Sequence, residues 1–120
     1  MRFNLIVSFF LISLVFACKN DSIGQGNPKN IAEQIAKDPG IIVDVRTPEE
    51  WNSGHHQRAI HADWDNGQFQ KEASKWDPSK TYYLYCAAGG RSSEATEYLK
   101  SKGFKKVFNL GGYNQAKNLK

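Results

Sequence analysis

Runs of apolar residues predict two central β-strands, at residues 41–45 (IIVDV) and 81–85 (TYYLY). Both runs are rich in β-branched or aromatic residues, which strands favour, and both are nearly continuous. Continuous runs are typical of strands that are covered on both faces, as in a parallel sheet. A brief strand is expected at residues 59–62 and a last strand at residues 106–110.

Helical spacing of apolar residues predicts helices before, between and after these strands. The expected helices are residues 30–38, a short helix from Pro48 that Trp51 anchors, residues 66–77, residues 92–102 and a short helix after Gly112. Thr47 can cap the second of these helices, Pro48 fits its first position, and Glu50 completes a capping box. Strands that alternate with helices imply right-handed crossovers, so the predicted fold class is α/β with a parallel sheet.

The N-terminus has the pattern of a secretory signal peptide, because Arg2 precedes an apolar run that ends in a small residue at position 17. The run is short for a transmembrane helix, which needs about 20 residues; an uncleaved apolar anchor is the alternative. Cys18 follows directly, and the junction VFAC resembles the lipobox of bacterial lipoproteins, in which the cysteine is acylated. We expect a signal peptide over residues 1–17 and a lipid-anchored tether over residues 18–29.

This organisation predicts one domain over residues 30–120, held at a membrane of the bacterial cell envelope and facing the periplasm or the exterior. Cysteines in such oxidising surroundings are usually paired. The chain has two cysteines, and a lipid on Cys18 would leave Cys86 without a partner. Cys86 is then either buried and inert or kept for its reactivity.

Composition and charge exclude some classes of site. The formal net charge of +4 is mild, and the chain has no dense tract of Lys or Arg. A nucleic-acid-binding face normally needs clustered basic residues, so no nucleic-acid partner is predicted. His55 and His56 are adjacent on an extended segment and should point to opposite faces. With no cluster of Cys, His and acidic residues at ligand spacing, no metal site is predicted.

The stretch YCAAGGRSSEA places Cys86 at the carboxyl end of a predicted central strand, where open α/β sheets bind ligands. Residues with small or no side chains follow, namely Ala87, Ala88, Gly89 and Gly90. They let the backbone curl, so that successive amides can converge on the sulfur. The next helix begins near Ser92, and both its N-terminus and Arg91 favour negative charge. The loop is therefore predicted to hold a thiolate and to accept an anionic substrate.

Three motifs in this order resemble the rhodanese family of sulfurtransferases, over a match from about Asn30 to Ala116. The segment IIVDVRTPEEWNSGH resembles the family's Asp-x-Arg, Pro-Glu-Glu and Gly-His pattern. The cysteine loop that opens a helix is the second motif, and GFKKVFNLGGY, which ends near paired glycines, is the third. The resemblance implies a parallel sheet of about five strands with helices on both faces.

The resemblance also implies sulfur transfer without a cofactor. Cys86 would attack a small anionic donor such as thiosulfate and become a persulfide, and a thiol or a protein acceptor would then remove the sulfur. The amides of residues 87–91 would hold the terminal sulfur, and Arg91 would bind donor oxyanions. Asp44 and Arg46 would have a structural role in fixing loops. The alternative is a persulfide carrier or binding module that docks on a partner and turns over little free thiosulfate.

Further features of the sequence refine this expectation. Four residues separate Cys86 from Arg91, whereas related cysteine-dependent phosphatases carry one more, which gives the wider loop that a phosphoryl group needs.

The segment GHHQRA departs from the family's Gly-His-Ile-x-Gly-Ala pattern, with His56 in place of an apolar residue and Arg58 in place of glycine. Arg58 is either solvated or projects toward the mouth of the site, where it would attract anions. No clear strand precedes residues 30–38, so the sheet edge is expected to be shortened.

Overall fold

The computed structural model describes residues 28–120. The predicted signal peptide, the lipidated Cys18 and most of the tether lie outside this range. The helices and strands are α1 (Pro28–Lys37), β1 (Ile41–Asp44), α2 (Pro48–Asn52), β2 (Ala59–His61), α3 (Gln68–Ala73), β3 (Thr81–Cys86), α4 (Gly90–Ser101), β4 (Lys106–Gly112) and α5 (Tyr113–Ala116). Helix α1 begins at Pro28, two residues before the helix that was predicted from residue 30.

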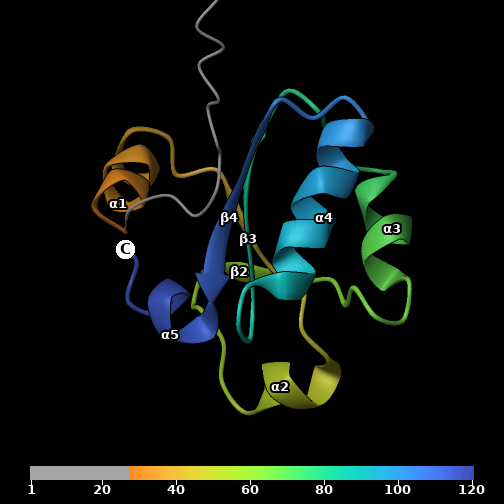
Figure 1. The fold of residues 1–120 in the computed structure, drawn as a ribbon, viewed down its shortest axis with the longest axis horizontal. Helices are drawn as coiled ribbons and strands as arrows, with labels where there is room; N and C mark the ends of the chain where they lie inside the picture. Colours follow the sequence, from red (N-terminus) through yellow and green to blue (C-terminus); the bar gives the residue numbers. More distant parts are fainter. Residues whose placement is uncertain (1–27) are drawn as a thin grey trace, which may run out of the picture.

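The four strands form one parallel sheet in the order β2-β1-β3-β4. Helices α1 and α5 lie on one face of the sheet, α3 and α4 lie on the other, and α2 lies beyond the carboxyl ends of the strands (Figure 1). The predicted α/β class with a parallel sheet is confirmed. The number of strands is corrected from about five to four within residues 28–120, and any further strand would have to come from outside that range.

Side chains that alternate along the strands build a core on each face of the sheet. Toward α1 and α5 the core contains Ile35, Ile42, Tyr83, Tyr85, Leu110 and Ala116. Toward α3 and α4 it includes Val43, Val45, Phe69, Tyr82, Leu84, Ala95 and Leu99. The three tyrosines of β3 are at most 1% exposed and therefore belong to the core.

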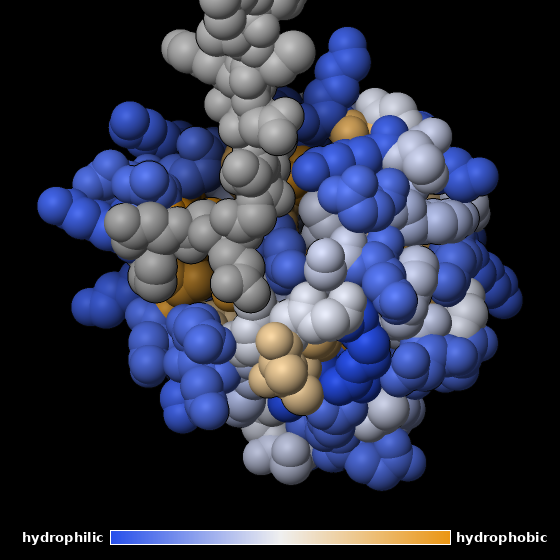
Figure 2. Space-filling view, in the orientation of Figure 1, coloured by the Kyte–Doolittle hydropathy of each residue, from blue (hydrophilic) through white to orange (hydrophobic). Residues whose placement is uncertain are grey.

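The outer surface is mostly hydrophilic in the view of Figure 2. Among residues 28–120, Ile60 is the large apolar side chain that stands out as exposed, at 43%. No helix within this range has the length and apolar character needed to cross a membrane.

Local sequence signals set the helix ends near the carboxyl edge of the sheet. Thr47 caps α2 as predicted, since its Oγ1 accepts from the Glu50 amide (3.4 Å) and its own amide donates to Glu50 Oε1 (3.3 Å). Helix α4 begins at Gly90, two residues earlier than predicted. Gly89 precedes it with φ of 101°, a conformation that glycine adopts without strain. The loop between β3 and α4 is therefore short.

Candidate active site

The cysteine loop, residues 86–91, lies at the carboxyl edge of the sheet, where β3 ends and α4 begins (Figure 1). Cys86 is the last residue of β3, an internal strand, so its predicted position is confirmed. The Gly89 amide donates a hydrogen bond to Cys86 Sγ (2.9 Å), and the Ser92 hydroxyl lies within donating distance of the same sulfur (3.3 Å). The sulfur also faces the N-terminus of a 12-residue helix, whose dipole favours an anion.

Burial and hydrogen bonding shift the pKa of the Cys86 thiol in opposite directions. The residue is 1% exposed, and burial raises the pKa of its thiol. Hydrogen bonds from the Ser92 side chain and from the amides of Ser92, Ala88 and Gly89 favour the thiolate, and together they hold the pKa below its ordinary value. These hydrogen bonds therefore favour the thiolate form of Cys86. A role of Cys86 as a nucleophile, which would then need no separate general base, stays a prediction. A role for the remaining loop amides in holding an outer sulfur stays a prediction.

Gly112, the second of the paired glycines, lets β4 lie directly against the cysteine loop. Gly112 pairs with Cys86 in the register of the sheet. A Cβ on Gly112 would lie 2.6 Å from the Ala87 carbonyl oxygen, a backbone atom that cannot easily move aside. Glycine at position 112 therefore leaves room for the start of the loop, which gives the third sequence motif a physical role.

Replacing Gly112 by alanine should lower the free energy of unfolding by about 1–3 kcal/mol, because the new methyl group overpacks the loop. The displaced loop should also slow alkylation of Cys86 by iodoacetamide at neutral pH. Urea unfolding and peptide mass spectrometry measure the two effects. Gly90→Ala is the matched control for stability, since its Cβ would meet no atom within 4 Å. Equal stability of the two variants would show that Gly112 has no such role.

Carboxylates from two other segments hold the Arg91 side chain. Its guanidinium donates two hydrogen bonds to Glu50 (2.8 and 3.0 Å) and one to Asp65 (3.3 Å). The hydrogen bonds from Arg91 lower the pKa of Glu50 to about 2. The pKa of Arg91 is raised, first by the hydrogen bond to Glu50 and further by the charge of Cys86, so this cation also favours the thiolate. Because these donors are already in use, binding of donor oxyanions by Arg91 stays a prediction.

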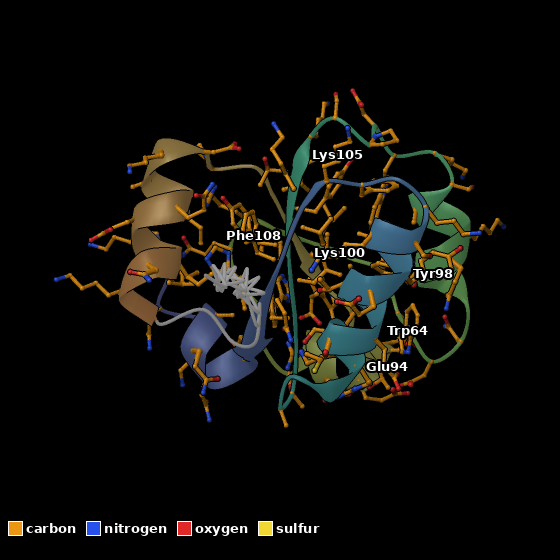
Figure 3. The ribbon with its side chains drawn as sticks, turned by 45° about the horizontal axis from the view of Figure 1, so that its top comes forward. Trp64, Glu94, Tyr98, Lys100, Lys105 and Phe108 are labelled. Carbon is orange, nitrogen blue, oxygen red and sulfur yellow. The ribbon has the colours of Figure 1, made fainter. Side chains whose placement is uncertain are left out.

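The segment that carries Asp65 is fixed against α4. Trp64 Nε1 donates to Glu94 Oε2 (3.1 Å), and the rings of Trp64 and Tyr98 meet edge to face with centroids 5.9 Å apart. Figure 3 shows Trp64 close to Glu94 and Tyr98, which both belong to α4. These contacts keep Asp65 next to Arg91, so Arg91 is braced by α2 and by the segment after β2.

Asp44 and Arg46 form a buried ion pair at the end of β1. Asp44 is 0% exposed and Arg46 is 4% exposed, and the guanidinium donates to the carboxylate over 2.7 to 3.1 Å. Arg46 Nη2 also donates to the Gly54 carbonyl (2.7 Å), and the guanidinium carbon lies 4.3 Å from the centre of the Tyr113 ring. The pair thus ties β1 to the loop after α2 and to α5, which fits the structural role expected of it.

The structure does not bring Arg58 to the sulfur. Arg58 directly precedes β2 at the amino edge of the sheet, whereas Cys86 ends β3 at the carboxyl edge. The strand register separates their levels by four residues, about 13 Å along the strands. The option in which Arg58 attracts anions at the mouth of the site does not fit this position, and the side chain is exposed to solvent.

The two adjacent histidines have separate partners. His55 stacks on Trp51 with ring centroids 3.4 Å apart. His56 Nδ1 accepts from the Arg58 amide (3.1 Å), so Nε2 carries the hydrogen and donates it to the Leu119 carbonyl (2.8 Å). Within residues 28–120, no group of three His, Cys, Asp or Glu side chains is placed to hold a metal ion.

Ser92 and Asn109 belong to the site, although the sequence motifs that contain them predicted no role there for either residue. Asn109 Oδ1 lies 2.7 Å from the Ser92 hydroxyl, and Asn109 Nδ2 donates to the Gly89 carbonyl (3.2 Å). A serine in the first turn of the helix after the loop is a signal that could have found Ser92. Asn109 comes from β4, and only the fold places it beside the loop.

Comparison with solved structures gives the same fold. A rhodanese from E. coli, solved with anions, is 33% identical with a TM-score of 0.56, over 62% of this chain and 88% of that chain. A rhodanese-like domain protein from Staphylococcus aureus is 28% identical with a TM-score of 0.62, over 76% of this chain and 87% of that chain.

Curated relatives are similar over one part of their length. A tRNA uridine(34) hydroxylase from Pelagibacter ubique is 31% identical over 112 residues, which cover 91% of this chain and 37% of that protein. A protein of the same name from Chlamydia trachomatis is 30% identical over 108 residues, or 82% of this chain and 33% of that protein. The chain thus spans about a third of the length of these relatives. The model of the rhodanese-like domain matches residues 27–119, and the chain belongs to this family.

Proposed function

We propose that this protein transfers sulfane sulfur through a persulfide on Cys86. In the loading step the thiolate attacks the outer sulfur of thiosulfate, the S–S bond of thiosulfate breaks, and sulfite leaves with the electron pair. In the discharge step a nucleophile such as cyanide or a thiolate bonds to the outer sulfur, and the electron pair of the broken bond returns to Cys86 Sγ. Two displacements replace one difficult transfer.

The main support for this proposal is the set of hydrogen bonds to Cys86 Sγ from the Gly89 amide and the Ser92 hydroxyl. They stabilise the thiolate both as the attacking group in loading and as the leaving group in discharge. Burial of the residue, at 1% exposure, favours a compact donor over a bulky one. A similar rhodanese from E. coli was solved with anions, which supports an anionic donor.

Thiosulfate and cyanide supplied to the purified full chain should give thiocyanate well above the uncatalysed rate. A persulfide that loads on Cys86 without appreciable turnover would favour the alternative, a carrier that docks on a partner protein. Absence of both loading and turnover would rule out both versions.

The proposed setting is a membrane of the bacterial cell envelope, reached through lipid on Cys18. Expressed in a bacterium that processes lipoproteins, the chain should partition into detergent. If Cys18→Ala partitions equally well, the apolar N-terminal segment is the anchor instead.

The names of the curated relatives favour a second candidate, a role in the modification of uridine in tRNA. Two facts weaken it: the chain spans about a third of those proteins, and its charge of +4 is spread without a dense basic tract. Incubation with tRNA followed by nucleoside analysis decides between the two. A uridine product that depends on Cys86, without thiocyanate formation, would replace the sulfur-transfer proposal.

A further inference from the structure

The Ser92 hydroxyl is buried among several hydrogen-bond acceptors. Ser92 is 0% exposed. Its Oγ lies 2.7 Å from Asn109 Oδ1, 3.1 Å from the Gly89 carbonyl, 3.3 Å from Cys86 Sγ and 3.5 Å from the Gly111 carbonyl. A hydroxyl has one hydrogen to donate, so it can serve one of these acceptors fully at a time.

The Asn109 side chain is oriented to be the competing acceptor. Its Nδ2 donates to the Gly89 carbonyl (3.2 Å), and its Oδ1 accepts from the Gly111 amide (2.9 Å). This network assigns the oxygen of the amide to the side that faces Ser92. When the sulfur of Cys86 is neutral, Asn109 Oδ1 is the nearest and strongest acceptor for the hydroxyl. When the sulfur is a thiolate, a hydrogen bond to it is charge-assisted and stronger than a neutral one.

We propose that Ser92 is a catalytic residue whose hydroxyl turns from Asn109 Oδ1 to Cys86 Sγ when negative charge develops on that sulfur. Asn109 is then a positioning residue that receives the hydroxyl while the sulfur is neutral. This inference rests on the sulfur-transfer function proposed above and names two residues that act in it.

The charge on Sγ changes twice in each cycle. After loading, Sγ is bonded to the outer sulfur, the charge sits on that outer atom, and the Ser92 hydroxyl returns to Asn109. During discharge the bond between the two sulfurs breaks, and the electron pair remains on Sγ. The hydroxyl then donates to a charge that is larger in the transition state than in the persulfide, which is the condition for lowering the barrier.

The pH dependence of Cys86 alkylation by iodoacetamide, followed on its peptide by mass spectrometry, tests the inference without any sulfur donor. Ser92→Ala removes a donor to the thiolate and should raise the midpoint of the profile by about one pH unit. At a pH below the midpoint, alkylation should then be about tenfold slower. Asn109→Ala removes the acceptor that stabilises the neutral state and should lower the midpoint. In the double variant there is no hydroxyl to release, so its midpoint should match that of Ser92→Ala.

A merely structural role predicts a different result. If the two side chains only brace the loop, both single variants should raise the midpoint, and their effects should add. That outcome, or an unchanged midpoint in Ser92→Ala, would overturn the inference. Thermal unfolding confirms that each variant is folded. Should Asn109→Ala not fold, Asn109→Leu nearly keeps the size of the side chain and also lacks the acceptor, so it should lower the midpoint; a midpoint that rises or stays unchanged would overturn the inference.

The discharge step gives a second readout. Protein preloaded with sulfur should lose it to cyanide about tenfold more slowly in Ser92→Ala than in the natural chain, by the same loss of thiolate stabilisation. The sulfur-transfer measurements and the alkylation profiles test the proposed function and the role of Ser92 separately. If the natural chain forms no thiocyanate, the sulfur-transfer function fails, whereas the alkylation profiles still report whether Ser92 donates to the sulfur.

Discussion

Cys86→Ser should lower the rate of thiocyanate formation by about 10³-fold or more. Serine nearly keeps the size of the side chain and can still accept the hydrogen bond from the Gly89 amide, so the loop should keep its shape. Its hydroxyl stays protonated near neutral pH and forms no persulfide, so neither loading nor discharge can proceed. Steady-state assay with thiosulfate and cyanide measures the loss, and urea unfolding verifies the fold.

The second cysteine of the chain provides the control for this experiment. Cys18→Ala, assayed in detergent, should keep the turnover of the natural chain because it lies outside the cysteine loop. Turnover by Cys86→Ser within tenfold of the natural rate would remove Cys86 from the mechanism and the persulfide with it.

Arg46→Met should lower the free energy of unfolding by about 3–5 kcal/mol. The substitution leaves the Asp44 carboxylate, which is 0% exposed, buried without its counter-charge. It also removes the hydrogen bond to the Gly54 carbonyl that ties β1 to the loop after α2. Urea unfolding followed by tryptophan fluorescence measures the change.

An exposed ion pair serves as the matched control. Lys75 and Glu72 are paired at 3.7 Å, with side chains 64% and 40% exposed, so Lys75→Met should cost no more than about 0.5 kcal/mol. Combining Arg46→Met with Asp44→Leu should recover part of the lost stability, because no charge then remains buried. A loss below about 1 kcal/mol in Arg46→Met would mean that other groups satisfy the Asp44 charge.

Local sequence signals were enough to predict the strands and the capped helix that position the site. Thr47 and Glu50 are three residues apart, so the cap that they form at α2 follows from spacing alone. The buried runs at residues 41–45 and 81–85 became β1 and β3 because nothing in them favours a turn. Once those strands are fixed, Cys86 has to lie at the carboxyl edge of the sheet.

Contacts between distant segments could not be predicted. Arg91 pairs with Glu50 and Asp65, which are 41 and 26 positions away, and one sequence does not indicate which acids a given arginine meets. Asn109 reaches Ser92 only because β4 pairs with β3. Whether Arg58 lies near Cys86 likewise depended on the register of β2, which the sequence of a three-residue strand does not specify.

The intact mass of the full chain after incubation with thiosulfate tests the central claim most directly, since it reports a loaded sulfur without any acceptor. We expect the mass to rise by one sulfur atom, located on the peptide that contains Cys86, and to return to its starting value after cyanide is added. An unchanged mass, or a sulfur atom carried by another residue, would contradict the assignment of Cys86 as the sulfur carrier.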